Sequence, residues 1–414
     1  MKKSQSFLVC IMLLITAHQT IGQKVYQWRG DNRDGVYNEN NLIKSWPEKG
    51  PELLWFNEDI GQGYAAPVVT NDKLLIIGEA DSTSYLFAFD LKGKLLWKTP
   101  NGKEYYGQGF SASYPGSRST PTVVGDLVYA TSGHGRLACF EVATGKEKWA
   151  VNMVRDLDGI ENEFGYSESP LIDGDDLFCT PGGANKNVVA LNRFTGKTTW
   201  TSKALGDTTS FSSPIMISLP GRKIFANISR HYIFGLDAKS GELLWSQKLE
   251  NFKYEGEHCS TPLFTDGFLY YIVEDENGNG AVKLEISPDG KNIKEMWRNK
   301  NATNAMGGYL KIGNHLFTTT NKKKLICIDA TTGNIVDSLS STKGSLIYAG
   351  NLFYCYNETG VVKLIKFENS KFAEISKFKV EKGTKEHFSH PVIANGTMYI
   401  RHGRALMAYD IQEK

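Results

Sequence analysis

The sequence predicts an all-β protein, an eight-bladed β-propeller built from four-stranded antiparallel blades. Two observations predict this fold. The phrase Gly-x-x-x-Trp recurs after strand-like runs, at residues 93–97, 145–149, 196–200 and 241–245. A proline followed by aliphatic or β-branched residues lies upstream of each copy, at Pro67, Pro121, Pro170 and Pro214. An all-strand pattern with a period of about 40 to 50 residues is typical of propellers and solenoids, whereas a β-sandwich does not repeat one phrase in this way.

One repeat unit, residues 119–151, shows how each element is justified. Strands are expected at 121–124, 127–131, 137–140 and 147–151, with turns between them. Pro121 suits the first position of a strand because it lacks an N–H donor, and Gly145 supplies the positive φ of a tight hairpin. Four short strands per unit make a propeller blade. We expect Trp149 to be buried between neighbouring blades.

Counting such units along the chain gives eight. Five carry a tryptophan in the fourth strand: Trp97, Trp149, Trp200, Trp245 and Trp297. The sixth has Asp337 at that position, and the seventh runs through residues 352–364. The last unit, 391–410, has three strands before the chain ends, so residues 52–55 are expected to add the fourth. The ring would then be closed by an N-terminal strand, which removes open sheet edges. Seven blades remain an alternative if one degenerate unit is not a blade.

The N-terminus resembles a secretory signal peptide. Lys2 and Lys3 precede an apolar run at residues 7–16, and small or polar residues follow. We predict a signal peptide over residues 1–22 and a single propeller domain over 23–414. The apolar run is too short to span a membrane, and Cys10 lies inside it rather than after small residues, so neither a transmembrane nor a lipid anchor is expected. The protein is predicted to be exported, to the periplasm or the extracellular space.

Charge and cysteine content exclude several classes of partner. Residues 1–22 hold two lysines and no acid, so their removal changes the formal net charge from +2 to 0. Mixed charges at 22% of residues do not suggest nucleic-acid binding, and we expect a monomer. Five cysteines remain, Cys139, Cys179, Cys259, Cys327 and Cys355, with no CxxC motif. We interpret them as small buried core residues, with disulfides as the alternative.

The repeat core, strand-Asp-x-x-Thr-Gly-Lys-x-x-Trp, resembles the pyrroloquinoline-quinone (PQQ) repeat of quinoprotein propellers. Other segments resemble an exported bacterial subgroup of this superfamily that is described as PQQ-binding-like; they are residues 28–35, 46–47, 50–55, 164–170, 179–183 and 343–346. The resemblance covers nearly the whole mature chain and implies an eight-bladed propeller. The superfamily includes quinoprotein dehydrogenases and also a non-enzymatic propeller lipoprotein of outer-membrane protein assembly.

The enzymatic branch of that superfamily makes demands that this sequence does not meet. Methanol-oxidising quinoproteins stack PQQ between a tryptophan and two adjacent disulfide-bonded cysteines, and they hold Ca²⁺ with carboxylate and amide oxygens. This chain has no Cys-Cys pair, and its repeat tryptophans occupy the blade-packing position. We therefore predict no cofactor and a non-catalytic envelope protein that binds a small molecule, a glycan or a protein partner. The alternative is a PQQ-dependent alcohol or sugar dehydrogenase that uses PQQ with Ca²⁺.

The segments that join the fourth strand of one blade to the first strand of the next gather on one face of a propeller. Three of them are long and rich in aromatic and charged residues: those before Pro121, Pro170 and Pro262. Long loops on a rigid scaffold are where binding groups concentrate. The candidate binding funnel at this channel mouth consists of Tyr114, Arg118, Tyr166, Glu168, Glu257, His258 and His387. Residues shortly before each proline, which also include Ser212, Ser260 and Phe388, are expected to line the mouth.

Plainer interpretations of these residues stay open. Arg118 and Glu168 could form a structural ion pair between blades. His258, His387 and His390 could be rim residues or, alternatively, a metal cluster. The segment from Asp31 to Gly35 lacks the ligand spacing of an EF-hand, so we favour a turn over a Ca²⁺ loop.

Overall fold

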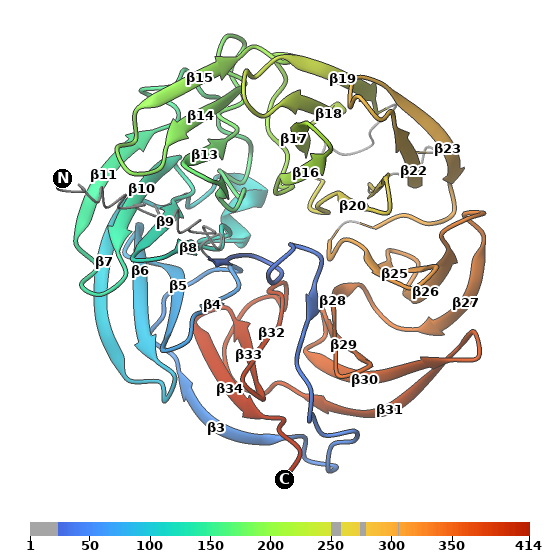
Figure 1. Ribbon diagram of the computed structural model, residues 1–414. Helices are drawn as coiled ribbons and strands as arrows, with labels where there is room; N and C mark the ends of the chain where they lie inside the picture. The colour runs from blue at the N-terminus through green and yellow to red at the C-terminus, as the bar shows by residue number, and fades with distance from the viewer. Residues whose placement is uncertain (1–23, 250–257, 274–278, 305) are drawn as a thin grey trace, which may run out of the picture.

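The computed structural model describes residues 24–249, 258–273, 279–304 and 306–414. These residues form eight separate sheets that surround a central axis, and the four blade strands of each sheet pair antiparallel (Figure 1). The eight-bladed all-β fold is therefore confirmed, and the seven-bladed alternative is wrong. The predicted signal peptide lies outside the described residues. The part of the chain described here contains no helix that is long and apolar enough to cross a lipid bilayer.

The first four blades follow the chain in order. Blade 1 comprises β4 (Val68–Val69), β5 (Lys73–Ala80), β6 (Thr83–Asp90) and β7 (Leu95–Lys103). Blade 2 comprises β8 (Thr122–Val124), β9 (Leu127–Thr131), β10 (Arg136–Glu141) and β11 (Glu147–Asn152), after the short 3₁₀ helix η1 (Gly109–Ser113). Blade 3 comprises β12 (Leu171–Asp173), β13 (Asp176–Cys179), β14 (Val188–Asn192) and β15 (Thr198–Ser202). Blade 4 comprises β16 (Ile215–Leu219), β17 (Arg222–Ile228), β18 (Tyr232–Asp237) and β19 (Leu243–Lys248).

The remaining blades complete the ring. Blade 5 comprises β20 (Leu263–Thr265), β21 (Phe268–Ile272), β22 (Ala281–Ile286) and β23 (Ile293–Asn299). Blade 6 comprises β24 (Leu310–Ile312), β25 (His315–Thr320), β26 (Lys324–Asp329) and β27 (Ile335–Ser340). Blade 7 comprises β28 (Gly344–Ala349), β29 (Leu352–Asn357), β30 (Val361–Glu368) and β31 (Lys371–Lys379). Blade 8 comprises β32 (Val392–Ala394), β33 (Thr397–His402), β34 (Ala405–Asp410) and, from the N-terminal side, β3 (Glu52–Asn57).

Strand β3 closes the ring as predicted. It pairs antiparallel with β34, from Glu52 opposite Asp410 to Asn57 opposite Leu406. Segments from the two ends of the chain thus share one sheet, and the strand order of blade 8 is β3-β34-β33-β32. Pairing the C-terminal strand in this way leaves no unfinished blade.

The recurring Gly-x-x-x-Trp phrase has a physical cause at the blade interfaces. Gly145 lies against Trp97 of the preceding blade, and a Cβ at position 145 would be 2.5 Å from that ring. The Trp97 indole N–H also donates to the carbonyl of Val142 at 3.1 Å. The same indole bond recurs from Trp55 to Leu91, Trp149 to Arg193, Trp200 to Ala238, and Trp297 to Ala330. The glycine and the tryptophan of one phrase therefore serve two different interfaces.

Blades 4, 6 and 7 depart from this rule, and blade 7 has no tryptophan in its fourth strand. Trp245 packs on Gly235 of its own blade, where a Cβ would be 2.3 Å from the indole. In blade 6 the Asp337 carboxylate takes the place of the tryptophan. It accepts from the backbone N–H of Phe372 at 2.8 Å and from Lys371 at 3.0 Å, both in blade 7. Hydrogen bonds to a charged carboxylate thus replace an aromatic contact at this interface.

Near the axis, hydroxyl groups just before the strand-opening prolines join neighbouring blades. The backbone N–H of Ala66 donates to Thr120 Oγ1 at 3.1 Å, Thr120 N–H donates to Ser169 Oγ at 3.1 Å, and Ser169 N–H donates to Ser213 Oγ at 3.0 Å. These four residues each precede a proline. The bonds satisfy buried backbone groups that no strand partner reaches.

A segment before β3 crosses the middle of the ring. We use the name N-terminal hairpin for residues 25–37, whose two short strands pair with different blades and not with each other. Its first strand, β1 (Val25–Tyr26), pairs antiparallel with β8 of blade 2, and its second, β2 (Val36–Tyr37), pairs in parallel with β28 of blade 7. Figure 1 shows this blue segment between the inner strands of the blades. The sequence did not predict these added strands.

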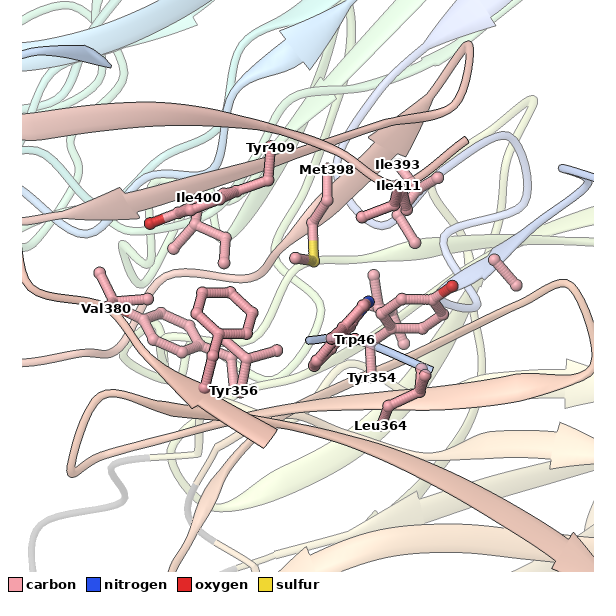
Figure 2. Close-up of a cluster of buried hydrophobic side chains, with 14 of the residues drawn as sticks. Trp46, Tyr354, Tyr356, Leu364, Val380, Ile393, Met398, Ile400, Tyr409 and Ile411 are labelled. Carbon is pink, nitrogen blue, oxygen red and sulfur yellow. The ribbon is translucent and has the colours of Figure 1, made fainter. Parts of the chain in front are cut away.

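Among the described residues, the largest apolar cluster lies at the interface between blades 7 and 8. Trp46 packs edge-on against Phe378 at 5.1 Å and tilted against Tyr354 at 5.9 Å, and both rings belong to blade 7. Figure 2 shows Trp46 between side chains of blade 7 and Met398, Ile393 and Ile411 of the C-terminal segment. Residues before β3 thereby fill an interface that has no repeat tryptophan.

Four cysteines fulfil the core prediction. Cys139, Cys179, Cys327 and Cys355 are all buried, and none of the four forms a disulfide. Burial raises the pKa of the Cys139 and Cys327 thiols to about 12. These thiols are therefore small apolar packing groups rather than nucleophiles.

Candidate functional site

Aromatic side chains from five interblade connections meet at the axis on the face that carries the long loops. Each ring lies in the connection just before the first strand of a blade. Tyr64 lies 5.6 Å from Phe388, and Phe388 stacks on Tyr114 at 6.4 Å. Tyr114 contacts Phe164 at 6.2 Å, and Phe164 contacts Phe211 at 5.6 Å. We call these five rings together with Arg118 the aromatic mouth.

Arg118 lies among these rings. Its guanidinium carbon is 5.3 Å from the centre of the Tyr64 ring and 5.5 Å from that of Phe164, within the range of cation–π attraction. The guanidinium donates to the carbonyl oxygens of Tyr114 at 2.6 Å and Gly116 at 3.0 Å. Burial lowers the pKa of Arg118 from its ordinary value. The side chain is therefore a partly dehydrated cation whose hydrogen bonds, among the described residues, go to backbone carbonyls and not to a carboxylate.

Two carboxylates lie close to the aromatic mouth, and each is already bound. Glu104 accepts from the Ser117 hydroxyl at 2.6 Å, from Gly133 N–H at 2.6 Å and from Tyr105 N–H at 3.0 Å. Glu386 accepts from the Tyr64 hydroxyl at 2.8 Å, and burial together with this bond raises the pKa of Tyr64. Neither makes an ion pair with Arg118 within the described residues.

Glu168, a second predicted funnel residue, is part of the channel wall. It is 8% exposed, and its carboxylate accepts from Thr180 N–H at 3.2 Å and from the Asn227 side chain at 3.1 Å. Burial raises the pKa of Glu168 to about 7. The interpretation of Arg118 and Glu168 as a structural ion pair is therefore wrong, because each side chain has its own hydrogen-bond partners.

Tyr166 is also buried in the wall. Its hydroxyl donates to the carbonyl of Pro181 at 2.8 Å, and burial raises its pKa. Ser212 and Ser260 are buried next to each other, with the Ser212 hydroxyl donating to the Ser260 carbonyl at 3.3 Å. Among the predicted residues, the structure thus brings Tyr114, Arg118 and Phe388 together at the mouth and assigns Tyr166 and Glu168 to the layer beneath.

The predicted histidines lie in separate environments. The His258 ring is buried with Nε2 at 3.2 Å from the carbonyl of Arg230, and His390 meets Trp28 edge-on at 5.1 Å. His387 hydrogen-bonds to the Tyr356 hydroxyl. The described residues contain no group of three or more His, Cys, Asp or Glu side chains that could hold a metal ion, so a histidine metal cluster is wrong. Glu257 lies outside the described residues.

His387 also stacks on His402, with ring centroids 3.6 Å apart. Burial, and secondarily the neighbouring His402, lowers the pKa of His387 to about 4. Both nitrogens of His402 face backbone carbonyls, Lys382 O at 2.6 Å and Lys385 O at 2.8 Å. This pair anchors the connection that carries Glu386 and Phe388 to the aromatic mouth.

Beneath the mouth, two arginines of the N-terminal hairpin bind the surrounding blades. Arg33 donates to the carbonyls of Ser169 at 3.2 Å, Pro214 at 3.0 Å and Pro170. Arg29 donates to the carbonyls of Tyr309 at 2.7 Å and Gly307. Burial lowers the pKa of each guanidinium to about 10. The interpretation of residues 31–35 as a turn is confirmed, but sequence reasoning missed both arginines.

A hollow lies at the opposite, short-turn end of the channel. A cavity of about 230 Å³ separates the N-terminal hairpin from blades 1 and 8, with Tyr26, Asp31, Tyr37, Val69 and Asn395 in its wall. Its lining mixes apolar, amide and charged groups. This cavity was not predicted, since its walls come from hairpin residues whose position the repeat does not specify.

The described residues do not fit a quinone of the methanol-oxidising type. The repeat tryptophans are held in blade interfaces by indole hydrogen bonds, with Trp97 to Val142 as an example, and the four buried cysteines lie in four different blades. Arg29 and Arg33 lie near the axis and donate mostly to backbone carbonyls, and Arg33 also donates to Gln27 Oε1 at 2.7 Å. The mouth combines aromatic surface with one cation, which is chemistry suited to binding.

The eight four-stranded blades and their repeat tryptophans define a PQQ-like, quinoprotein-type β-propeller. The sequence profile of the family described as outer membrane protein assembly factor BamB matches residues 82–339, and the chain belongs to that family. It is 23% identical over 332 residues to outer membrane protein assembly factor BamB of Shewanella oneidensis, an alignment that covers 77% of this chain and 70% of that relative.

Solved structures show the same fold. BamB from Moraxella catarrhalis aligns with a TM-score of 0.62 at 14% identity, over 87% of this chain and 99% of that one. The quinohemoprotein alcohol dehydrogenase ADHIIG from Pseudomonas putida HK5 aligns with a TM-score of 0.52 at 13% identity, over 95% of this chain and 81% of that one. At these identities the likeness defines the architecture only.

Proposed function

We propose that this chain is a non-catalytic binding protein of the cell envelope that holds a protein partner at the aromatic mouth. The observation that carries the proposal is the gathering of rings from five interblade connections around Arg118. Aromatic residues and arginine are the side chains that most often dominate the energy of protein interfaces. A rigid ring of blades holds them in place without a large ordering cost on binding.

Exposed apolar side chains extend this surface outward along the same connections. Phe110 is 67% exposed and its ring contacts Tyr114 at 5.3 Å and Phe164 at 6.3 Å. Tyr106 and Ile160, in the same pair of connections, are 53% and 50% exposed. A contiguous apolar surface rimmed by polar groups marks an interaction site.

The family supports a protein partner rather than a small substrate. The matching family and the Shewanella relative are both described as outer membrane protein assembly factors. We extend that role to this chain, with export to the periplasm or cell surface through the signal peptide proposed for residues 1–22. In this account the propeller is a docking platform and carries no cofactor.

A PQQ-dependent dehydrogenase is the second candidate function, and only the shared propeller fold supports it. Calorimetry with PQQ and Ca²⁺ separates the two. We expect no binding tighter than about micromolar, which corresponds to about −8 kcal/mol. Sub-micromolar binding accompanied by dye-linked alcohol oxidation would favour the dehydrogenase.

Site-specific photo-cross-linking in the native host tests the docking surface. The photoreactive amino acid p-benzoylphenylalanine replaces Phe110, and in a matched control it replaces Phe194. Phe194 is also an exposed phenylalanine, at 46%, with an arginine 4.0 Å from its ring, but it lies in a short turn between β14 and β15. We expect one envelope protein to cross-link through position 110 and not through position 194.

The captured protein must then bind the purified chain saturably, and replacing Phe110 by Ala must weaken that binding. Equal cross-linking from both positions, or an adduct that fails this binding measurement, would contradict the proposal.

A further inference from the structure

We propose that Arg118 recognises a carboxylate side chain, from Asp or Glu, that the partner presents among apolar residues. This inference rests on the proposed function, because it assigns the chemistry of the group that enters the aromatic mouth. The argument depends on which donors of Arg118 are free, which acids surround it and what covers it.

The guanidinium of Arg118 has unused donors. A guanidinium carries five N–H groups in a planar fork. In Arg118 the two terminal nitrogens donate one hydrogen bond each, to the carbonyl oxygens of Tyr114 and Gly116. The nearby rings of Tyr64 and Phe164 restrict its orientation. A fork held in this way loses little freedom when it binds a planar, two-oxygen acceptor.

Arg118 differs from Arg136 and Arg298, which are also partly exposed, because no acid among the described residues pairs with it. Arg136 pairs with Glu147 at 2.8 Å and Arg298 with Glu295 at 2.6 Å, each within its own blade. Around Arg118, Glu104 and Glu386 are engaged by other donors, and no carboxylate of the described residues comes within ion-pair distance of it. The charge of Arg118 therefore has room for an incoming counter-ion.

The neighbouring buried cation does not compete for such a ligand. Arg401 is 0% exposed and directs its donors to the carbonyls of Ile77 at 2.6 Å, Gly403 at 2.8 Å and Gly61 at 3.0 Å. Its charge is satisfied inside blade 8 and the adjoining segment of blade 1. Within the aromatic mouth as defined above, the partly exposed Arg118 is thus the cation that a partner can reach.

The rings around Arg118 favour a carboxylate with apolar neighbours over a free anion. Phe388 and Tyr114 stack beside the arginine, and exposed Phe110 extends the apolar surface. Apolar side chains of a partner would cover these rings and exclude water, which strengthens the ion pair in the centre. A solvated anion without apolar groups gains none of this.

Titration calorimetry with two capped tripeptides tests the assignment on the protein from residue 23 to residue 414. The probes are acetyl-Phe-Asp-Phe-amide and its neutral twin acetyl-Phe-Asn-Phe-amide. We expect the Asp peptide to bind at least about tenfold tighter than the Asn peptide, or about 1.4 kcal/mol. Arg118→Gln should bring this ratio close to one, and Arg118→Lys, which keeps the charge but lacks the fork, should leave an intermediate ratio.

Arg404→Gln serves as the control, since Arg404 is exposed and interacts with Asp59 at 3.5 Å; its ratio should match that of the unaltered protein. Equal affinities, or no binding of either peptide, would overturn the inference. Tighter binding of acetyl-Phe-Asn-Phe with a free C-terminus would overturn the side-chain assignment in favour of a chain end. If cross-linking at position 110 succeeds while the two peptides bind equally, the inference fails and the proposed function stands. If cross-linking fails while the Asp peptide binds about tenfold tighter, Arg118 recognises a carboxylate but the proposed function fails.

Discussion

The Trp55 ring, from the N-terminal strand, lies directly against Gly93 of blade 1. A Cβ at position 93 would be 2.6 Å from the indole, and the Trp55 N–H donates to Leu91 O at 3.0 Å. This contact joins blade 8 to blade 1 and thereby closes the ring. The closure seam uses the same glycine-on-tryptophan packing as the interfaces inside the chain.

Replacing Gly93 by Ala should destabilise the protein by more than the cost of placing an alanine at a positive φ. Gly93 has φ +83°, and Gly221 has φ +79° with no atom within 4 Å of an added Cβ. Gly221→Ala therefore reports the cost of the conformation, about 1 kcal/mol. Gly93→Ala adds a clash with Trp55, for which we expect a further 1–3 kcal/mol, roughly the range for overpacking. Chemical denaturation measures both, and equal losses would contradict the packing role.

Deleting residues 23–56 should abolish cooperative unfolding. The deletion removes nearly all of β3, the N-terminal hairpin and Trp46, so it exposes the edge of β34 and opens the cluster between blades 7 and 8. We expect aggregation or a broad melting transition in calorimetry. A truncated chain that melts like the full chain would show that ring closure does not depend on this segment.

Much of this fold could be predicted from the repeated sequence pattern, because the repeat reflects a repeated packing contact. Each Gly-x-x-x-Trp unit makes the same contact with its neighbours, so the repeat predicts the blades and β3 completes the last one. Even the exception at Asp337 occupies the expected position, although its hydrogen bonds to blade 7 could not be foreseen.

The residues that form the candidate site were predicted less completely than the fold. Tyr114 and Arg118 stood out because they lie in a long loop before a proline, but Tyr64 and Phe164 of the same mouth were missed. Which residue of such a connection faces the axis depends on loop geometry that the repeat does not encode. Arg33 was missed for a related reason, since most of its acceptors are backbone carbonyls of distant residues and leave no pattern in the sequence.

Arg33 should be one of the most sensitive positions in the protein. It is 4% exposed and satisfies carbonyl groups at the start of blades 3 and 4. Arg33→Met keeps much of the volume but leaves those acceptors unpaired, so we expect a loss of about 3 kcal/mol or more in the free energy of unfolding. The control is Arg155→Met, because the Arg155 side chain is 78% exposed. Similar losses in the two variants would contradict the clamping role.

The pH dependence of stability should reveal Glu168. The folded-state pKa of about 7 lies above the ordinary 4.5, so the folded protein holds this proton more tightly than the unfolded chain. The stabilising contribution is fully present below pH 4.5 and is lost as pH rises through about 7. Glu168→Gln lacks this titration, so its stability relative to the unaltered protein should increase from pH 5 to pH 8, by at most about 1.4 kcal/mol per pH unit.

Denaturation at four pH values between 5 and 8 measures this difference, with exposed Glu163→Gln as the control. A difference between Glu168→Gln and the unaltered protein that stays constant across this range would show that Glu168 is charged throughout.

The central claim is that the aromatic mouth is the docking site, and the affinity of Arg118→Ala for the cross-linked partner tests it most directly. We predict that this variant loses about 1–3 kcal/mol of binding free energy, roughly the range for removing a charged hydrogen-bond partner, while its melting temperature stays near that of the unaltered protein. Phe194→Ala on the opposite face should bind normally. If Arg118→Ala binds the partner with full affinity and only melts at a lower temperature, then Arg118 is scaffold and the mouth is not where the partner docks.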